Sequence, residues 1–143
     1  MRHLMMLLFL FLNLELYGQE AVGKWKTIDD ETGKTRSIVE IYEEHGKFYG
    51  KITALLLDPE EPKDPICNEC DISDPRYKQK IIGMEIIKDM IFDDSDSEYV
   101  DGTILDPANG SVYECKIWVS DEGTLKVRGY ISFLYRTQTW LPF

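Results

Sequence analysis

The most conspicuous pair of reactive side chains in the sequence is Cys67 and Cys70, spaced as C-x-x-C. Such a pair can form a local disulfide, supply half of a metal site or act as a redox centre. A redox cysteine needs a lowered thiol pKa, but the acidic neighbours Asp64, Glu69 and Asp71 disfavour the thiolate. The residues therefore favour a disulfide between the two cysteines, which would tie together a proline-rich loop.

A zinc site is another possibility for this pair, and it would need two further ligands. His45 and Cys115 are the candidates, and they would join the pair only if the fold happened to bring them there. Cys115 is in phase with the alternating residues Tyr113 and Ile117, which predicts a buried unpaired thiol instead. We therefore expect neither a metal ion nor a cofactor.

Nucleophilic catalysis has few candidate residues, because the chain contains only two histidines, His3 and His45. His45 falls in a predicted hairpin turn and is interpreted as a solvated turn residue rather than a general base. The acidic run at residues 93–98 lacks the glycine and the spacing of an EF-hand calcium loop, so it also indicates a solvated turn. No catalytic residue is assigned.

Charged and aromatic side chains also occur within predicted strands, among apolar neighbours. In an antiparallel sheet with one solvated face, the charged side chains would face water. If the sheet closes into a barrel and they face its interior, they would instead orient a ligand in a mostly apolar pocket. On that second interpretation, the candidate ligand-binding residues are Tyr49, Lys51, Glu85, Tyr113, Arg128 and Tyr130.

Strands must position these residues, because almost every periodic segment alternates with period two. Residues 58–80 contain four of the six prolines and both paired cysteines, and they are expected to form one long loop. Eight strands joined mainly by short turns predict an all-β, eight-stranded antiparallel up-and-down barrel, with a β-sandwich as the rival architecture. The predicted strands are 23–28, 35–43, 47–57, 81–92, 99–105, 111–120, 124–133 and 137–141.

Residues 1–18 have the pattern of a signal peptide. Arg2 and His3 precede nine consecutive apolar residues, and this run is too short for a membrane span, which needs about 20. Cleavage after Gly18 would leave a single domain over residues 19–143. We therefore expect the mature protein to be exported, either periplasmic or secreted, with no stable membrane span.

The charge balance narrows the possible partners. A formal net charge of -10 argues against nucleic acid and against an anionic membrane surface, because both require a cationic face. The hydrophobic share of 43% is too high for a disordered acidic chain. The composition therefore predicts a folded acidic domain.

A series of short motifs runs along the chain: Gly23-Lys24-Trp25, Gly50-Lys51-Ile52, Gly83-Met84-Glu85-Ile86-Ile87, Gly102-Thr103-Ile104-Leu105-Asp106-Pro107, Lys126-Val127-Arg128-Gly129-Tyr130 and Arg136-Thr137-Gln138-Thr139-Trp140. In this order they resemble the bacterial exported family known as domain of unknown function number 2147. The resemblance spans residues 23–140 and implies an exported, lipocalin-like β-barrel, without implying an activity.

A looser resemblance to lipocalins concerns the first strand. Gly23-x-Trp25 is similar to the lipocalin G-x-W motif, in which the tryptophan closes one end of the barrel. The resemblance implies an arginine packed over that indole in a cation–π contact, with Arg136 as the matching residue and Arg128 as the alternative.

Three hypotheses about function follow. The first is a non-enzymatic extracytoplasmic barrel that binds a small, partly apolar ligand. The second is a structural or interaction module with a filled barrel, which contacts an unknown protein partner through loop 58–80 or the acidic turns. The third, less favoured, is a carboxylate-dependent enzyme, which would require Glu85 or Glu40 to be buried beside Arg128.

Overall fold

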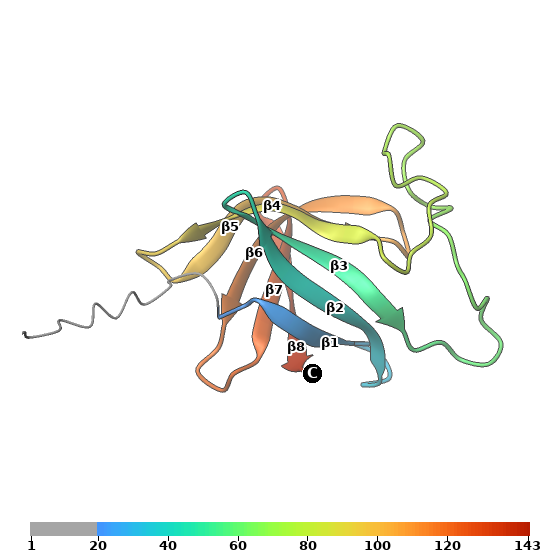
Figure 1. Ribbon diagram of the computed structural model, residues 1–143, viewed down its shortest axis with the longest axis horizontal. Coiled ribbons are helices and arrows are strands. Elements are labelled where there is room, and N and C mark those ends of the chain that lie inside the picture. Colours follow the sequence, from blue (N-terminus) through green and yellow to red (C-terminus); the bar gives the residue numbers. More distant parts are fainter. Residues whose placement is uncertain (1–19) are drawn as a thin grey trace, which may run out of the picture.

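Eight antiparallel strands pair in sequence order and close into a barrel in the computed structural model, which describes residues 20–143 (Figure 1). The predicted eight-stranded up-and-down barrel is thereby confirmed over the sandwich. The predicted signal peptide lies outside the described residues. The strands are β1 Gly23–Ile28, β2 Thr35–Glu44, β3 Lys47–Leu55, β4 Glu85–Asp93, β5 Glu98–Asp106, β6 Ser111–Val119, β7 Leu125–Ile131 and β8 Leu134–Pro142. No helix within residues 20–143 is long and apolar enough to cross a bilayer.

The barrel closes along a short seam between its first and last strands. The β1–β8 ladder consists of two residue pairs, Trp25 with Pro142 and Lys26 with Leu141. The N–H of Phe143 also donates to the carbonyl of Lys24 at 3.2 Å. All other neighbouring strands share longer ladders, so the seam has the fewest paired residues in the barrel wall.

The fourth strand begins later than the alternation predicts, at Glu85 rather than at residue 81. The preceding residues form a turn in which Gly83 adopts a φ of 89° and donates its N–H to the carbonyl of Ile52 at 2.6 Å. Only a residue tolerant of positive φ fits this turn. Residues 81–84 therefore belong to the long connection that follows β3.

The β7–β8 connection is a two-residue turn formed by Ser132 and Phe133, and Ser132 adopts a φ of 56°. The sequence shows none of the glycine or asparagine that usually marks such a hairpin, so alternation alone extends the predicted strand through Phe133. In the structure β8 instead starts at Leu134. Phe133 lies at the tip of the hairpin with 85% of its surface exposed.

One end of the barrel is filled by side chains. Trp25, with 7% of its surface exposed, donates its indole N–H to the carbonyl of Ala21 at 2.8 Å. The backbone N–H of Ala21 in turn donates to the Tyr99 hydroxyl at 3.3 Å, and the Tyr99 ring packs edge-on against Phe48. Ala21, Phe48 and Tyr99 enclose no space large enough for a water molecule, so this is the closed end.

The long connection between β3 and β4 extends beyond the other end of the barrel (Figure 1). The disulfide between Cys67 and Cys70 is present and buried, as the sequence predicts. An isolated bridge between Ile66 and Lys80 joins the two sides of the loop. A Cβ atom added to Gly110, in the β5–β6 turn, would lie 1.7 Å from the carbonyl oxygen of Glu69. The loop is therefore packed directly against that turn.

An ion pair inside the loop makes its stability depend on pH. Asp74 and Arg76 are paired at 2.9 Å and both side chains are largely buried, while Arg76 also donates to the carbonyl of Glu85. The hydrogen bond from Arg76 lowers the pKa of Asp74 from 3.8 to about 2. A carboxyl whose pKa is lower in the folded state stabilises the fold above its unfolded pKa and loses that contribution as the pH falls through its folded pKa.

We therefore expect Asp74→Asn to reduce the free energy of unfolding by about 2 kcal/mol at neutral pH. The difference from the unmodified protein should shrink between pH 3.8 and about 2 and then vanish. Urea unfolding across this range measures it, with Asp121→Asn in an exposed turn as the control. A difference that stays constant with pH would mean that the charge of Asp74 is not its cause.

Candidate functional site

The open end of the barrel contains a cavity of about 970 Å³. It is bordered by the β1–β2, β5–β6 and β7–β8 turns and by the start and end of the long loop. This volume lies at the upper end of the range of roughly 300–1,000 Å³ that is typical of small-molecule sites. The barrel is therefore filled at one end and hollow at the other.

The inner wall of the cavity is apolar, because alternation turns the apolar side of each strand inward. Its residues include Ile52 on β3, Ile104 on β5 and Val127 on β7. Trp140 on β8 also lines it, with only 2% of its surface exposed, and its indole N–H donates to the Gln138 side-chain carbonyl at 3.1 Å. The wall thus offers mainly apolar contact surface to a ligand.

A few polar groups interrupt this wall. The hydroxyls of Thr27 and Ser37 are hydrogen-bonded at 2.6 Å where β1 and β2 pair. The Asn109 amide donates to the Tyr113 hydroxyl at 3.3 Å near the β5–β6 turn. Sparse, positioned polar groups on an apolar surface are the usual means of orienting a small molecule.

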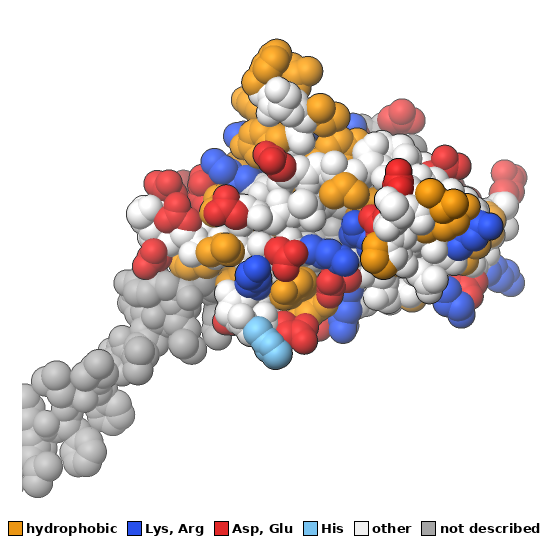
Figure 2. Space-filling model, turned by 90° about the horizontal axis from the view of Figure 1, so that it is seen from above, with side chains coloured by type: hydrophobic (Ala, Val, Ile, Leu, Met, Phe, Trp, Pro, Cys, Tyr) orange, Lys and Arg blue, Asp and Glu red, His pale blue; other side chains and the backbone are white. Residues whose placement is uncertain are grey.

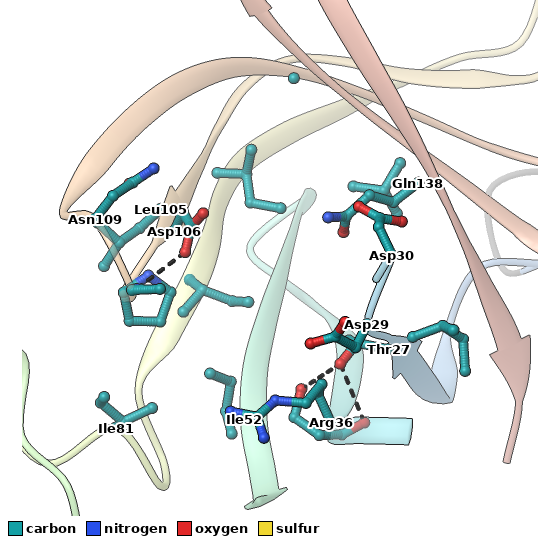
Figure 3. Close-up of a pocket in the computed structure, with 18 of the residues that line it drawn as sticks. Thr27, Asp29, Asp30, Arg36, Ile52, Ile81, Leu105, Asp106, Asn109 and Gln138 are labelled. Atoms are coloured by element: carbon teal, nitrogen blue, oxygen red, sulfur yellow. Dashed lines mark hydrogen bonds between the residues drawn. The ribbon is translucent and has the colours of Figure 1, made fainter. Parts of the chain in front are cut away.

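The rim of the cavity carries charged groups on opposite sides. Figure 3 shows Asp106 and Asn109 on one side, and Asp29, Asp30 and Arg36 on the other. Arg36 is paired with Glu61 of the long loop at 3.1 Å, and Arg136 on β8 is paired with Asp30. The two arginines therefore link the barrel wall to the segments that border the opening.

Two rim carboxylates are held by backbone N–H groups. Asp29 accepts hydrogen bonds from the N–H groups of Thr32 and Glu31, and these lower the pKa of its carboxyl. Asp106 accepts the N–H of Ala108 at 2.9 Å. Both carboxylates are fixed by the turns that they begin, so their positions follow from the local turn sequences.

The β7–β8 hairpin adds exposed apolar surface to the rim. Ile131, Leu134 and Tyr135 all line the cavity and all remain mostly exposed. Large exposed apolar side chains at the edge of an apolar cavity are characteristic of a binding entrance rather than of an ordinary surface turn.

Of the six ligand-binding candidates from the sequence, the structure places only Tyr113 in the cavity wall. Tyr49, Lys51 and Glu85 lie outside the residues that line it. There the Tyr42 hydroxyl donates to Glu85 at 2.6 Å, and Lys51 lies over the Tyr42 ring. Burial, followed by the bond to Glu85, raises the pKa of Tyr42. These side chains therefore lie on the outer face of the barrel and not in the cavity.

Arg128 and Tyr130 also lie outside the cavity. The guanidinium of Arg128 contacts the rings of Trp118 and Tyr135, at 4.9 and 4.2 Å from their centres. Its neighbours Val127 and Gly129 occupy the inward positions, so alternation forces Arg128 outward. Neither Glu85 on β4 nor Glu40 on β2 is buried, and neither strand neighbours β7, which carries Arg128. The structure therefore does not form the carboxylate–arginine arrangement that the enzyme hypothesis names.

Arg136 does not occupy the position that the lipocalin resemblance implies. It lines the open rim and pairs with Asp30, whereas Trp25 is hydrogen-bonded at the closed end. Trp25 and Lys26 pair with the last two residues of β8, whereas Arg136 lies near the start of that strand and therefore at the opposite mouth. In the described part of the chain, the arginine with cation–π contacts is Arg128, and its indole partner is Trp118.

The cysteines take up separate positions. Cys67 and Cys70 are joined to each other, and Cys115 is a buried free thiol whose pKa is raised by burial to about 12. Within residues 20–143, no group of three or more histidine, cysteine or acidic residues is placed to hold a metal ion. The zinc arrangement with His45 and Cys115 is therefore not formed.

The rim residues Asp30 and Arg36 and the wall residue Gln138 are missing from the candidates that the sequence suggests, and Arg136 is suggested there only as a barrel-closing residue. Their strands or turns were predicted, but strand alternation does not tell which turns border the hollow end. The one available signal was Gln138, which is in phase with buried Trp140 in the last strand.

Two comparisons with known proteins bear on this barrel. The family described as "Uncharacterized protein conserved in bacteria (DUF2147)" matches residues 23–141. A solved structure, protein HP1028 from the human pathogen Helicobacter pylori, is described as belonging to the lipocalin family. It superposes with a TM-score of 0.69 at 20% identity, covering 86% of this chain and 82% of that one. This likeness shows a shared lipocalin-like fold. No curated protein matches the chain.

Proposed function

The chain belongs to the family of uncharacterized proteins conserved in bacteria (DUF2147), and for this member we propose the function of a binding protein that holds one small, partly apolar ligand in its barrel. The observation that carries the proposal is the cavity of about 970 Å³ at the open end. Its apolar wall and its few positioned polar groups match the general composition of small-molecule sites.

The asymmetry of the barrel supports this proposal over the filled-barrel alternative. A purely structural module would gain stability from side chains packed along its whole interior. Here the closed end is packed around Trp25 and Phe48, but the open end is left hollow beneath a rim of turns. Leaving a large apolar surface in contact with water lowers stability, and a ligand would offset that loss.

We also propose that the protein works outside the cytoplasm. The apolar run within residues 1–18 supports export, and so does the disulfide in the long loop, because structural disulfides persist mainly in oxidising compartments. Fractionation of the native host tests this location.

The face of the molecule seen in Figure 2 carries interspersed acidic and basic side chains rather than one basic patch, which agrees with a small-molecule ligand.

A cavity-filling substitution tests the binding function. Ile104→Trp should place an indole inside the cavity and weaken binding of the neutral apolar dye N-phenyl-1-naphthylamine by about tenfold or more. Val112→Trp adds the same side chain at an exposed position on the adjacent strand β6 and should leave binding unchanged. Fluorescence titration measures both, and thermal unfolding checks that each variant is folded.

Native mass spectrometry of protein purified from its own host gives an independent test. The expected result is an adduct that leaves on denaturation and is reduced in Ile104→Trp. If the unmodified protein carries no adduct and binds no apolar dye, the proposed function is wrong.

A further inference from the structure

Acidic side chains outnumber basic ones in the lining of the cavity. Within the described residues, two guanidinium groups and no lysine line the cavity, and the guanidinium groups are those of Arg36 and Arg136. Five carboxylates line it as well, those of Asp29, Asp30, Glu31, Glu61 and Asp106. Each arginine is already paired with one of these carboxylates, Arg36 with Glu61 and Arg136 with Asp30. Asp29, Glu31 and Asp106 form no ion pair with another lining residue, although the charge of Arg36 helps to lower the pKa of Asp29. The lining therefore keeps a surplus of three negative charges.

The unbalanced negative charge is held in place by the backbone. Asp29 accepts two backbone N–H groups and Asp106 accepts one, so neither side chain can turn away from its turn without losing these bonds. The chain as a whole has a formal charge of -10, which adds to the negative potential at the opening. A cleft lined by one sign of charge concentrates ligands of the opposite sign.

An anionic head group would meet two obstacles at this rim. It could reach the remaining N–H groups of Arg36 or Arg136 only beside Glu61 or Asp30, whose negative charges already offset these two guanidinium groups. It would also lie among the three unbalanced carboxylates. Negative charges that share a partly desolvated site repel each other.

A cationic head group would meet favourable partners instead. The free carboxylates lie on both sides of the opening, as Figure 3 shows for Asp29 and Asp106. The ring of Tyr113 lines the same cavity, and aromatic faces attract organic cations. The charge of the rim and the apolar wall beneath it thus suit the two ends of one molecule.

We propose that the cavity selects a cationic amphiphile, whose apolar body lies against Ile52, Ile104 and Val127 and whose amine or quaternary ammonium head stays among the rim carboxylates. This inference rests on the proposed binding function and deepens it by giving the charge class of the ligand. It follows from the positions of the charged side chains relative to the cavity, not from the acidity of the chain alone.

Three probes with the same dodecyl chain test the proposal: dodecyltrimethylammonium, tridecanoate and dodecanol, each below the concentration at which it forms micelles or aggregates. Displacement of N-phenyl-1-naphthylamine reports their affinities. At low salt we expect the affinity for the ammonium probe to be higher than that for the carboxylate probe by about tenfold or more. Near 1 M salt, where the Debye length is about 3 Å, this preference should narrow.

Matched variants separate the rim from the overall charge. The triple variant Asp29→Asn, Glu31→Gln and Asp106→Asn removes the three unbalanced carboxylates, and it should abolish most of the preference for the ammonium probe. The control triple variant Asp94→Asn, Asp121→Asn and Glu122→Gln makes the same change in net charge in exposed turns that border the closed end. It should keep the preference.

The outcomes distinguish the inference from the function on which it rests. If the alcohol binds but the carboxylate probe binds as tightly as the ammonium probe, or more tightly, the inference is overturned and the binding function stands. The same holds if the control triple variant loses the preference as fully as the rim variant. If none of the three probes displaces the dye, the proposed function fails and the inference fails with it.

Discussion

Trp25→Ala is expected to lower the free energy of unfolding by ~3–5 kcal/mol, the usual range for removing a buried aromatic side chain. Trp25 is 7% exposed, belongs to the main hydrophobic core, and ties the segment before β1 to the closed end through its bond to Ala21. It also belongs to one of the two residue pairs of the β1–β8 seam. The substitution therefore removes core packing and weakens the closure of the barrel at the same time.

Equilibrium unfolding in urea measures this loss, with Trp118→Ala as the matched control. Trp118 is a partly exposed tryptophan outside the core, and its known contact is with the Arg128 guanidinium. Its removal should cost only about 1 kcal/mol. In Trp25→Ala, the rate of backbone hydrogen exchange should also increase more in β1 and β8 than in β3. Equal losses for the two tryptophans would show that Trp25 does not hold the closed end together.

The second large effect is expected for Gly110→Ala, which should destabilise the protein by about 3 kcal/mol or more. Gly110 has a φ of 74°, which costs any other residue conformational energy. The new Cβ atom would also lie 1.7 Å from the carbonyl oxygen of Glu69 and 2.9 Å from the N atom of Cys70. These are backbone atoms beside a disulfide, so the loop has to move away from the turn as a unit.

Gly123→Ala is the control for the conformational part of this effect. Gly123 has a φ of 80°, and a Cβ atom there would meet nothing within 4 Å. Its substitution should cost only about 1 kcal/mol. The difference between the two variants then reports the contact between loop and turn. Limited proteolysis should cut the long loop faster in Gly110→Ala than in Gly123→Ala, and equal rates would contradict the packing described for this loop.

The loop contact also bears on binding, because the long loop contributes Glu61, Pro62 and Pro65 to the cavity. The disulfide, the ion pair between Asp74 and Arg76, and the packing against Gly110 all hold the loop in one arrangement. A binding site whose rim is fixed in advance loses less conformational entropy when a ligand enters. Gly110→Ala should therefore weaken dye binding as well as stability.

The number of strands and their order follow from the sequence, because alternation and turn residues are local signals. The β5–β6 hairpin shows this: its alternating strands and its Asp106–Gly110 turn can be read from one continuous stretch, residues 98–119. The disulfide was likewise indicated by the spacing of two cysteines three residues apart. In the same way, alternation alone shows that Tyr113, Cys115 and Ile117 share one face of their strand.

The site itself was decided by the tertiary structure. Alternation shows that Arg128 and Val127 point to opposite sides of β7, but only the closure of the sheet determines which side is the interior. The rim pairs Arg136 with Asp30 and Arg36 with Glu61 each join residues that are distant in sequence and that meet only after closure. The hollow end depends on how side chains from all eight strands fill a shared volume, which is a sum over long-range contacts that no local pattern contains.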